Sequence, residues 1–192
     1  KVACIAGADN FDQLANWETL DLRERSLSAL PARIGALPVL RLLLGGNRIT
    51  DLPAHFCLLP AVRVLVLDGN GLRSLPHDFG SLHHLEELHL GDNALTALPE
   101  SFASLAALAA LRLEGNQLAY LPQGFGALVR LRSANLSDNR LTQLPLGFCG
   151  LPRLQTLDVG CNRLAALPGA FGDLAALRDL AASGSPLTAL PG

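Results

Sequence analysis

The stretch LRLEGNQLAYLPQGF, residues 111–125, sets one asparagine among leucines and follows it with a Leu-Pro pair and a phenylalanine. Asparagine recurs every 23 residues along the chain, at positions 47, 70, 93, 116, 139 and 162. Leu-Pro pairs recur in the same register, as do six of the seven phenylalanines, at positions 56, 79, 102, 125, 148 and 171. A repeat of this regularity defines the structural unit of the fold.

Each unit reads L-x-x-L-x-L-x-x-N-x-L-x-x-L-P-x-x-F-x-x-L-x-x. Its x-L-x-L-x segment has the period of a short strand whose alternate residues face inward. One unit cannot bury its own leucines, but eight units stacked at the ~4.8 Å strand spacing form a parallel sheet roughly 34 Å long over a continuous core. The proline ends the strand, and we expect the F-x-x-L segment to return along the convex side as a short helical or irregular stretch.

The repeat predicts an α/β solenoid of about eight turns, starting near residues 17, 39, 62, 85, 108, 131, 154 and 177. Residues 1–16 precede it as an N-terminal cap or flank, and residues 17–192 form the solenoid. Arg25 takes the asparagine slot in the first turn and Ser185 takes it in the last. Because Leu187 and Leu190 occupy core slots with nothing after Gly192 to cover them, we expect the natural protein to continue further.

The repeated asparagines are predicted to be structural. A chain that turns away from a strand inside a packed stack leaves backbone groups short of partners, and an asparagine side chain can both donate to them and accept from them. The predicted structural ladder consists of Asn47, Asn70, Asn93, Asn116, Asn139 and Asn162.

These residues resemble the leucine-rich repeats. The 23-residue L-P-x-x-F form is similar to the intracellular type related to Ras-binding scaffold proteins and to LPX-type bacterial repeat proteins, over residues 17–192. The resemblance implies a horseshoe-shaped solenoid whose concave sheet binds a macromolecule, usually a protein. Ala134, Val159 and Ala182 depart from the family pattern by replacing core leucines. The cysteine-rich caps of secreted members are absent, which favours an intracellular protein.

Composition narrows the function classes. Fifteen Lys and Arg residues against seventeen Asp and Glu residues give a net charge of −2, without the basic excess that nucleic-acid binding requires. No apolar run is long enough to span a bilayer. Cys4, Cys57, Cys149 and Cys161 are scattered, which indicates neither a disulfide framework nor a zinc site. We therefore expect a soluble cytoplasmic protein, or one delivered into a host cytosol if it is a bacterial effector.

Candidate binding residues flank the core leucines of each strand, where the fold leaves side chains free to vary. Acidic residues outnumber basic ones at these positions, so a protein partner with a basic patch would associate faster. Three of the candidates are apolar and would form an exposed cluster unless residues 1–16 fold back over it. The predicted partner-binding residues are Leu43, Val64, Val66, Asp68, Glu87, His89, Arg112, Glu114, Asn135 and Asp158.

Metal binding and catalysis are not predicted. His83 and His84 belong to the segment that leads into a strand, whereas His89 lies on the strand itself, so the three do not converge on one ion. The titratable residues of the strand column come without a nucleophile, a pocket or a water-excluding lid. We expect no catalytic residues, no metal and no cofactor.

Two functions remain open from the sequence. The first is a scaffold-type, non-catalytic module that binds a protein partner through its concave face. The second is the substrate-targeting arm of a larger enzyme, such as a kinase or a ubiquitin-ligase effector, whose catalytic domain lies outside this chain. The sequence does not disclose the partner, because the fold alone does not specify it.

Overall fold

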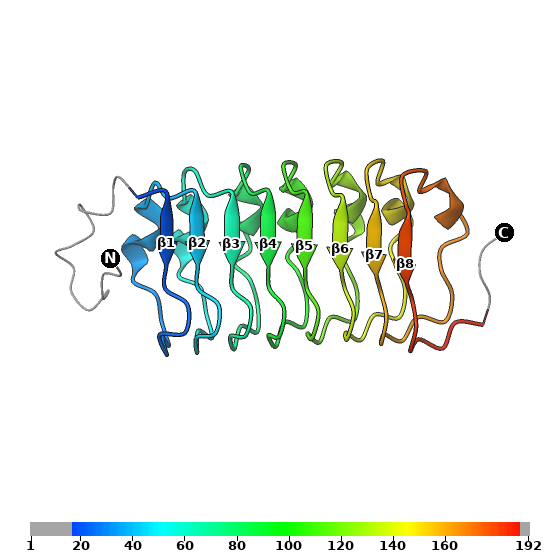
Figure 1. The fold of residues 1–192 in the computed structure, drawn as a ribbon, viewed down its shortest axis with the longest axis horizontal. Coiled ribbons are helices and arrows are strands. Elements are labelled where there is room, and N and C mark those ends of the chain that lie inside the picture. Colours follow the sequence, from blue (N-terminus) through cyan, green and yellow to red (C-terminus); the bar gives the residue numbers. More distant parts are fainter. Residues whose placement is uncertain (1–16, 189–192) are drawn as a thin grey trace.

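Eight short parallel strands stand side by side in one sheet (Figure 1). The computed structural model describes residues 17–188. Each strand pairs with the next one along the chain, in the order β1 to β8, as a solenoid requires. The strands are β1 (Thr19–Asp21), β2 (Arg41–Leu43), β3 (Val64–Val66), β4 (Glu87–His89), β5 (Ala110–Arg112), β6 (Ser133–Asn135), β7 (Thr156–Asp158) and β8 (Asp179–Ala181).

The middle residue of each strand from β1 to β7 is buried in the core, as the alternation predicts, whereas Leu180 in β8 is 40% exposed. Leu42, Leu65 and Leu88 are fully buried, and Ala134 fills the same position in β6. The strands are three residues long rather than the five of the x-L-x-L-x pattern, but hydrogen bonding between turns extends beyond them. The N–H of Leu90, just after β4, donates to the carbonyl of Arg112 at 2.9 Å.

Short 3-10 helices form the layer behind the sheet (Figure 1). In five of them the proline of the Leu-Pro pair is the residue before the helix, where its fixed φ suits an extended entry and its missing N–H is not needed. The described helices are η2 (Ala32–Ala36), η3 (Ala54–Leu58), η4 (Phe79–Ser81), η5 (Glu100–Ser104), η6 (Gln123–Ala127), η7 (Leu146–Gly150) and η8 (Phe171–Asp173).

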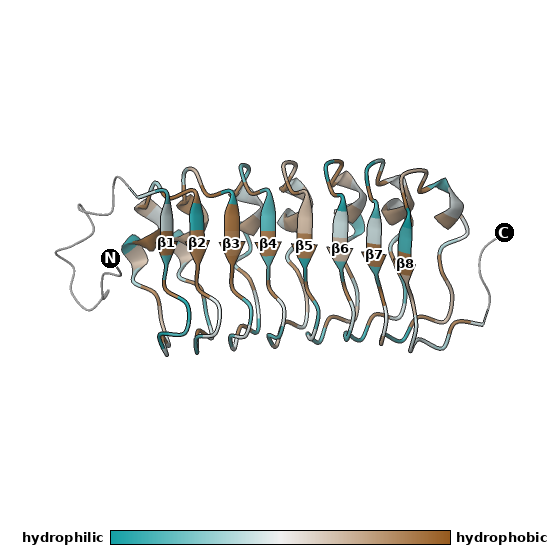
Figure 2. Ribbon diagram, in the orientation of Figure 1, coloured by the Kyte–Doolittle hydropathy of each residue, from teal (hydrophilic) through white to brown (hydrophobic). Residues whose placement is uncertain are grey.

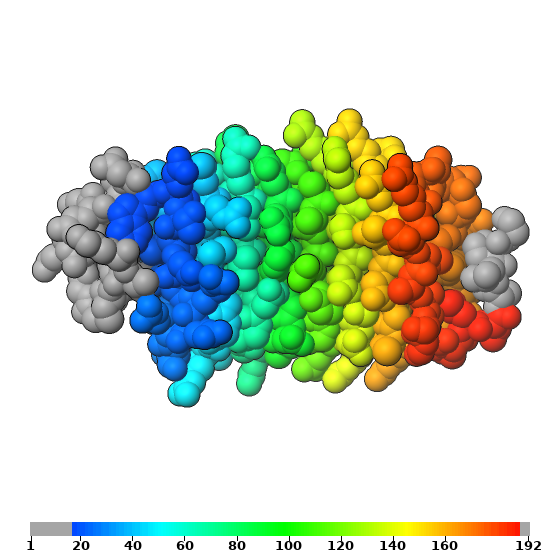
Figure 3. All heavy atoms as spheres, in the orientation of Figure 1, coloured from blue at the N-terminus to red at the C-terminus, as the bar shows by residue number. Residues whose placement is uncertain are grey.

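The repeated phenylalanines belong to the 3-10 helices and are buried in the core. Phe79, Phe102, Phe125 and Phe148 are fully buried, and their rings stack in sequence with centroid separations of 5.5–6.3 Å. These four consecutive repeats therefore build one continuous column of stacked rings. In the space-filling view, successive turns lie against one another as bands across the molecule (Figure 3).

The asparagines join consecutive turns through hydrogen bonds to the backbone. Asn116 accepts from the N–H of Leu95 at 3.0 Å and donates to the carbonyls of Leu90 at 2.9 Å and Leu113 at 3.0 Å. Asn47, Asn70, Asn93, Asn139 and Asn162 make equivalent donations. Because these carbonyls point into the turn, the side chain supplies the donor that the backbone lacks.

The two ends depart from the regular turn. The N–H of Arg25 donates to Asn47 Oδ1 at 3.0 Å, and the N–H of Asn162 donates to Ser185 Oγ at 3.2 Å, so each end is tied to its neighbour. The expected cap of residues 1–16 lies outside the described residues, and so does Leu190. Within residues 17–188, no helix is long and apolar enough to cross a membrane.

Candidate functional site

One surface gathers the predicted binding residues, and we call it the strand face. It consists of the first and third residues of each strand together with the loop residue two positions further on. The pairing register sets the third residues of consecutive strands next to one another. In order from β1, this row reads Asp21, Leu43, Val66, His89, Arg112, Asn135, Asp158 and Ala181.

His89 lies at the centre of the strand face between two carboxylates. Its Nε2 is 2.7 Å from Glu87 Oε1, and its Nδ1 is 3.4 Å from Asp68 Oδ2. The hydrogen bond to Asp68 raises the pKa of His89 above its ordinary value; Glu87 adds to this effect and burial opposes it. The side chain is 16% exposed. His89 therefore holds a proton more readily than a free histidine does and offsets the negative charge around it.

Glu114 and Asp68 approach each other over a glycine. A Cβ atom placed on Gly91 would lie 3.1 Å from Cδ of Glu114 and 3.2 Å from Oδ1 of Asp68. The N–H of Gly91 donates to that Asp68 oxygen at 2.6 Å. Glu114 Oε2 is buried and accepts no hydrogen bond within the described residues. The absence of a side chain at position 91 thus leaves room for the carboxyl groups of Asp68 and Glu114 on either side of Gly91.

The predicted exposed apolar cluster is wrong for Val64, which is only 8% exposed. It lies in the register between Arg41 and Glu87, whose longer side chains flank it on both neighbouring strands. Leu43 and Val66 are half-buried. The apolar character is nevertheless local, since β3 is the most hydrophobic strand and β4 beside it is polar (Figure 2).

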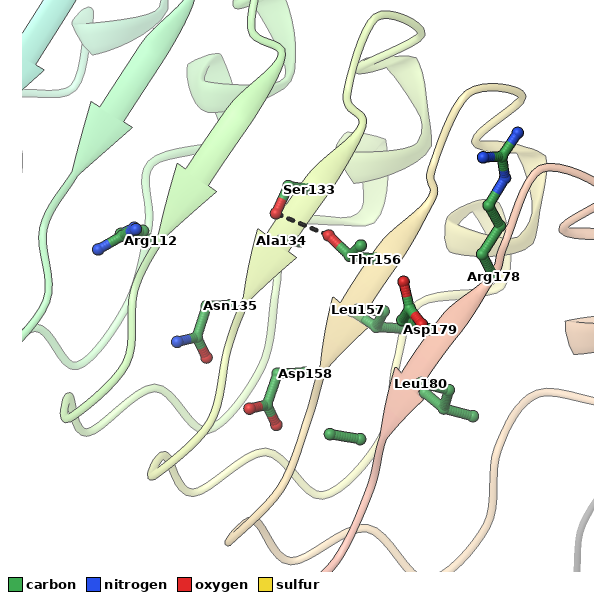
Figure 4. Close-up of a pocket in the computed structure, with 11 residues that line it drawn as sticks. Arg112, Ser133, Ala134, Asn135, Thr156, Leu157, Asp158, Arg178, Asp179 and Leu180 are labelled. Atoms are coloured by element: carbon green, nitrogen blue, oxygen red, sulfur yellow. Dashed lines mark hydrogen bonds between the residues drawn. The ribbon is translucent and has the colours of Figure 1, made fainter.

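A hollow of about 700 Å³ lies on the strand face over β5–β8, and the sequence analysis did not identify it (Figure 4). Its lining includes the predicted Arg112, Asn135 and Asp158. Between these, the strands carry short side chains, such as Ser133 and Ala181. In the sequence, the hollow corresponds to small residues at equivalent positions of adjacent turns. These residues indicate a hollow only when the positions are known to be neighbours in space.

The remaining polar candidates are separate from this surface. His83 and His84 are exposed in the segment before β4. Burial raises the pKa of the Cys57 thiol to about 12, with Asp78 adding to the effect. Asp138 raises the pKa of the exposed Cys161. Both thiols are thus held in the protonated, less nucleophilic form near neutral pH.

A family model matches most of the chain. The model for the leucine rich repeat matches residues 60–118 and 122–187. No curated protein matches the chain.

Solved structures of repeat proteins are similar to this chain over most of its length. A Leptospira interrogans LRR protein is 26% identical with a TM-score of 0.68, covering 96% of this chain. The LRR ectodomain of the plant membrane receptor kinase GASSHO1/SCHENGEN3 from Arabidopsis thaliana, solved in complex with CASPARIAN STRIP INTEGRITY FACTOR 2, is 34% identical with a TM-score of 0.77 over 84% of this chain. A TDR receptor is 26% identical with a TM-score of 0.76 over 82%. The chain spans 59%, 20% and 28% of those three structures, respectively.

Proposed function

Because the chain belongs to the leucine-rich repeat family, we propose that it is a protein-interaction module that binds a protein partner through its strand face without catalysing a reaction. The observation that carries the proposal is the row of side chains from His89 to Asp158, in which each strand presents a different chemical group on one continuous surface. A module that only stacked on itself would have no need for such variety.

The charge around His89 supports a partner with a basic patch. Asp68, Glu87 and Glu114 lie around it, so a protonated His89 and the neighbouring Arg112 together still leave one acidic group in excess. Opposite charge accelerates encounter between proteins, and added salt weakens the effect. We expect the association rate to fall as the salt concentration rises.

A reducing compartment such as the cytoplasm is part of the proposal. The described cysteines Cys57, Cys149 and Cys161 are all free thiols, and unpaired thiols are typical of reducing compartments. Mass spectrometry of thiols alkylated at the moment of lysis tests this. Free thiols in the protein taken from cells support the location, and mixed disulfides on Cys161 argue for an oxidising one.

The second candidate is the recognition arm of a larger enzyme. Similarity to a segment of a receptor kinase's ectodomain favours it, because that protein joins repeats to a kinase. We also propose that residues 17–192 act as one solenoid in either case, with residues 1–16 as a flank. The full-length reading frame separates the two candidates, since a catalytic domain next to the repeats supports the second.

Affinity capture from lysates of the source organism or its host tests the main proposal. The strand-face variant His89→Ala, Arg112→Glu, Glu114→Arg is compared with the parent chain. The matched control is His84→Ala, Glu100→Arg, Arg130→Glu, which makes the same three exchanges at exposed positions outside the strands. We expect the strand-face variant to lose a partner that the parent and the control both retain. Retention by all three would contradict the proposal.

A further inference from the structure

The hollow over β5–β8 holds side chains with unused bonding capacity. Asn135 Oδ1 accepts hydrogen bonds from the backbone N–H of Ser137 at 3.1 Å and from its hydroxyl at 2.7 Å. Its amide nitrogen donates to no group in residues 17–188. Asp158 Oδ1 accepts from the N–H of Gly160 at 2.8 Å, which leaves Oδ2 free within the same residues. In each side chain one oxygen is thus fixed by hydrogen bonds within the chain. The other polar atom, Nδ2 of Asn135 or Oδ2 of Asp158, is available to a ligand.

Arg112 completes the row on the β5 side. It is exposed and forms no ion pair within the described part of the chain. The register places Arg112 beside Asn135 and Asn135 beside Asp158. Read across the strands, the row presents a cation, an amide donor and an anion (Figure 4).

Several of the charged groups over β1–β4 pair within the chain instead. Arg23 contacts Asp21 at 2.7 Å, Arg63 pairs with Glu86, and His89 contacts two carboxylates. A group that already has an internal partner gains less from a ligand than a group without one. Over β5–β7, by contrast, Arg112 and Asp158 form no ion pair within the described residues, so their charges remain available to a ligand.

Shape adds a second constraint. The short side chains of Ser133, Thr156 and Ala181 leave the hollow open along the sheet, between Arg112 at one end and Arg178 at the other. The hydroxyl of Thr156 donates to that of Ser133 at 2.8 Å, which links β7 to β6 along the lining (Figure 4). Such a shallow, elongated site suits an extended chain lying across the strands.

We propose that the hollow binds an extended peptide segment of the protein partner, with an acidic side chain against Arg112 and a basic side chain against Asp158. A backbone carbonyl of the segment accepts from the amide of Asn135. Two strand steps separate Arg112 from Asp158, or about 9.6 Å, which an extended peptide covers in about three residues. This inference rests on the proposed function and names the chemistry that the partner brings to that surface.

Selection from a random peptide library on the full 192-residue chain tests the inference. The parent is compared with Arg112→Glu, with Asp158→Asn and with the control Arg130→Glu, which is exposed outside the strands. Asn at position 158 keeps the oxygen that accepts from Gly160, so the turn is preserved while the charge is removed. Melting temperatures confirm that each variant is folded.

The parent and the control should select peptides with one acidic and one basic residue about three positions apart. Arg112→Glu should exchange the acidic residue for a basic one, and Asp158→Asn should lose the basic preference. A parent-selected peptide should bind either variant about tenfold or more weakly than it binds the parent. The direction in which the peptide crosses the sheet does not affect these outcomes, because each variant changes one charge.

Peptides without this charge pair, a motif that Arg112→Glu leaves unchanged, or no selected peptide at all would overturn the inference. The proposed function is judged separately by capture of the partner. The strand-face variant could lose the partner while the selected peptides show no consistent charge. That result would refute the inference and still support the proposed function. A partner that all variants retain would refute both.

Discussion

The side-chain amide of Asn116 donates to the carbonyl of Leu90, in the preceding turn, at 2.9 Å. The same amide also donates to Leu113 at 3.0 Å within its own turn, and its oxygen accepts from the N–H of Leu95 at 3.0 Å. One buried side chain therefore connects two turns through backbone groups that have no other partner from secondary structure. The other five asparagines of the ladder also donate to a carbonyl of the preceding turn.

Asn116→Ala should lower the free energy of unfolding by about 1–3 kcal/mol, because the bridged backbone groups stay buried without partners. Chemical denaturation of the two proteins measures the difference. Gln117→Ala is the control, since its side chain makes no hydrogen bond in the described residues and the change should cost less than about 0.5 kcal/mol. Equal stability of Asn116→Ala and the parent would show that the ladder does not stabilise the stack.

Phe125→Ala should cost about 3–5 kcal/mol, because it removes one ring from the middle of the column and leaves a cavity. Phe125 is fully buried and stacks with Phe102 and Phe148. Leu146→Ala, at a side chain that is 84% exposed, should have almost no effect. Similar losses for both variants in a denaturant titration would contradict the assigned core.

Gly115→Ala should destabilise the chain by about 1–2 kcal/mol or more, because L-residues disfavour its left-handed conformation. The φ of Gly115 is +66°, and a Cβ atom there would collide with Oδ1 of Asp92. The control is Gly169→Ala, where a Cβ atom meets nothing within 4 Å. A thermal melt in which Gly115→Ala is as stable as Gly169→Ala would rule out the strain argument.

The contribution of His89 to stability should fall as the pH rises. Its pKa is raised in the folded protein, chiefly by the hydrogen bond to Asp68, so folding favours the protonated form. The stabilisation is fully present below the unfolded pKa, about 6.5, and is lost as the pH passes through the higher folded pKa. Asp68 and Glu87 are the charged groups that raise this pKa, and burial of the ring opposes them. The guanidinium of Arg112 lies next to His89 in the register.

Unfolding free energies of the parent and His89→Gln, measured at several pH values, check this prediction. The advantage of the parent should be larger near about pH 6 than near about pH 9. An advantage that grows with pH would mean that His89 is held neutral instead. An NMR titration of the ring protons gives the folded pKa directly.

The architecture could be predicted from the sequence because the 23-residue repeat specifies it. Asparagine, Leu-Pro and phenylalanine share one 23-residue spacing, and stacked repeats of one length place each strand beside the next. The parallel order β1 to β8 confirms that prediction. The strands span three residues rather than the five of the pattern, although hydrogen bonds between turns continue past the third residue, as from Leu90 to Arg112.

The burial and the contacts of the side chains on the strand face could not be predicted from the repeat. Alternation assigns Val64 to the outer face correctly, but its burial depends on the lengths of Arg41 and Glu87 in other turns. The contact of His89 with Asp68 depends on a side-chain rotamer, and a period does not specify rotamers. The hollow results from several short side chains together, so no single residue signals it.

The dissociation constant of the captured partner tests the central claim most directly. Purified partner is titrated into the parent, the variant His89→Ala, Arg112→Glu, Glu114→Arg, and the matched control His84→Ala, Glu100→Arg, Arg130→Glu, all at one salt concentration. We predict that the strand-face variant binds at least about tenfold more weakly than the parent, while the control binds like the parent. If the strand-face variant binds as tightly as the parent, or if the control weakens equally, the partner does not bind through the strand face.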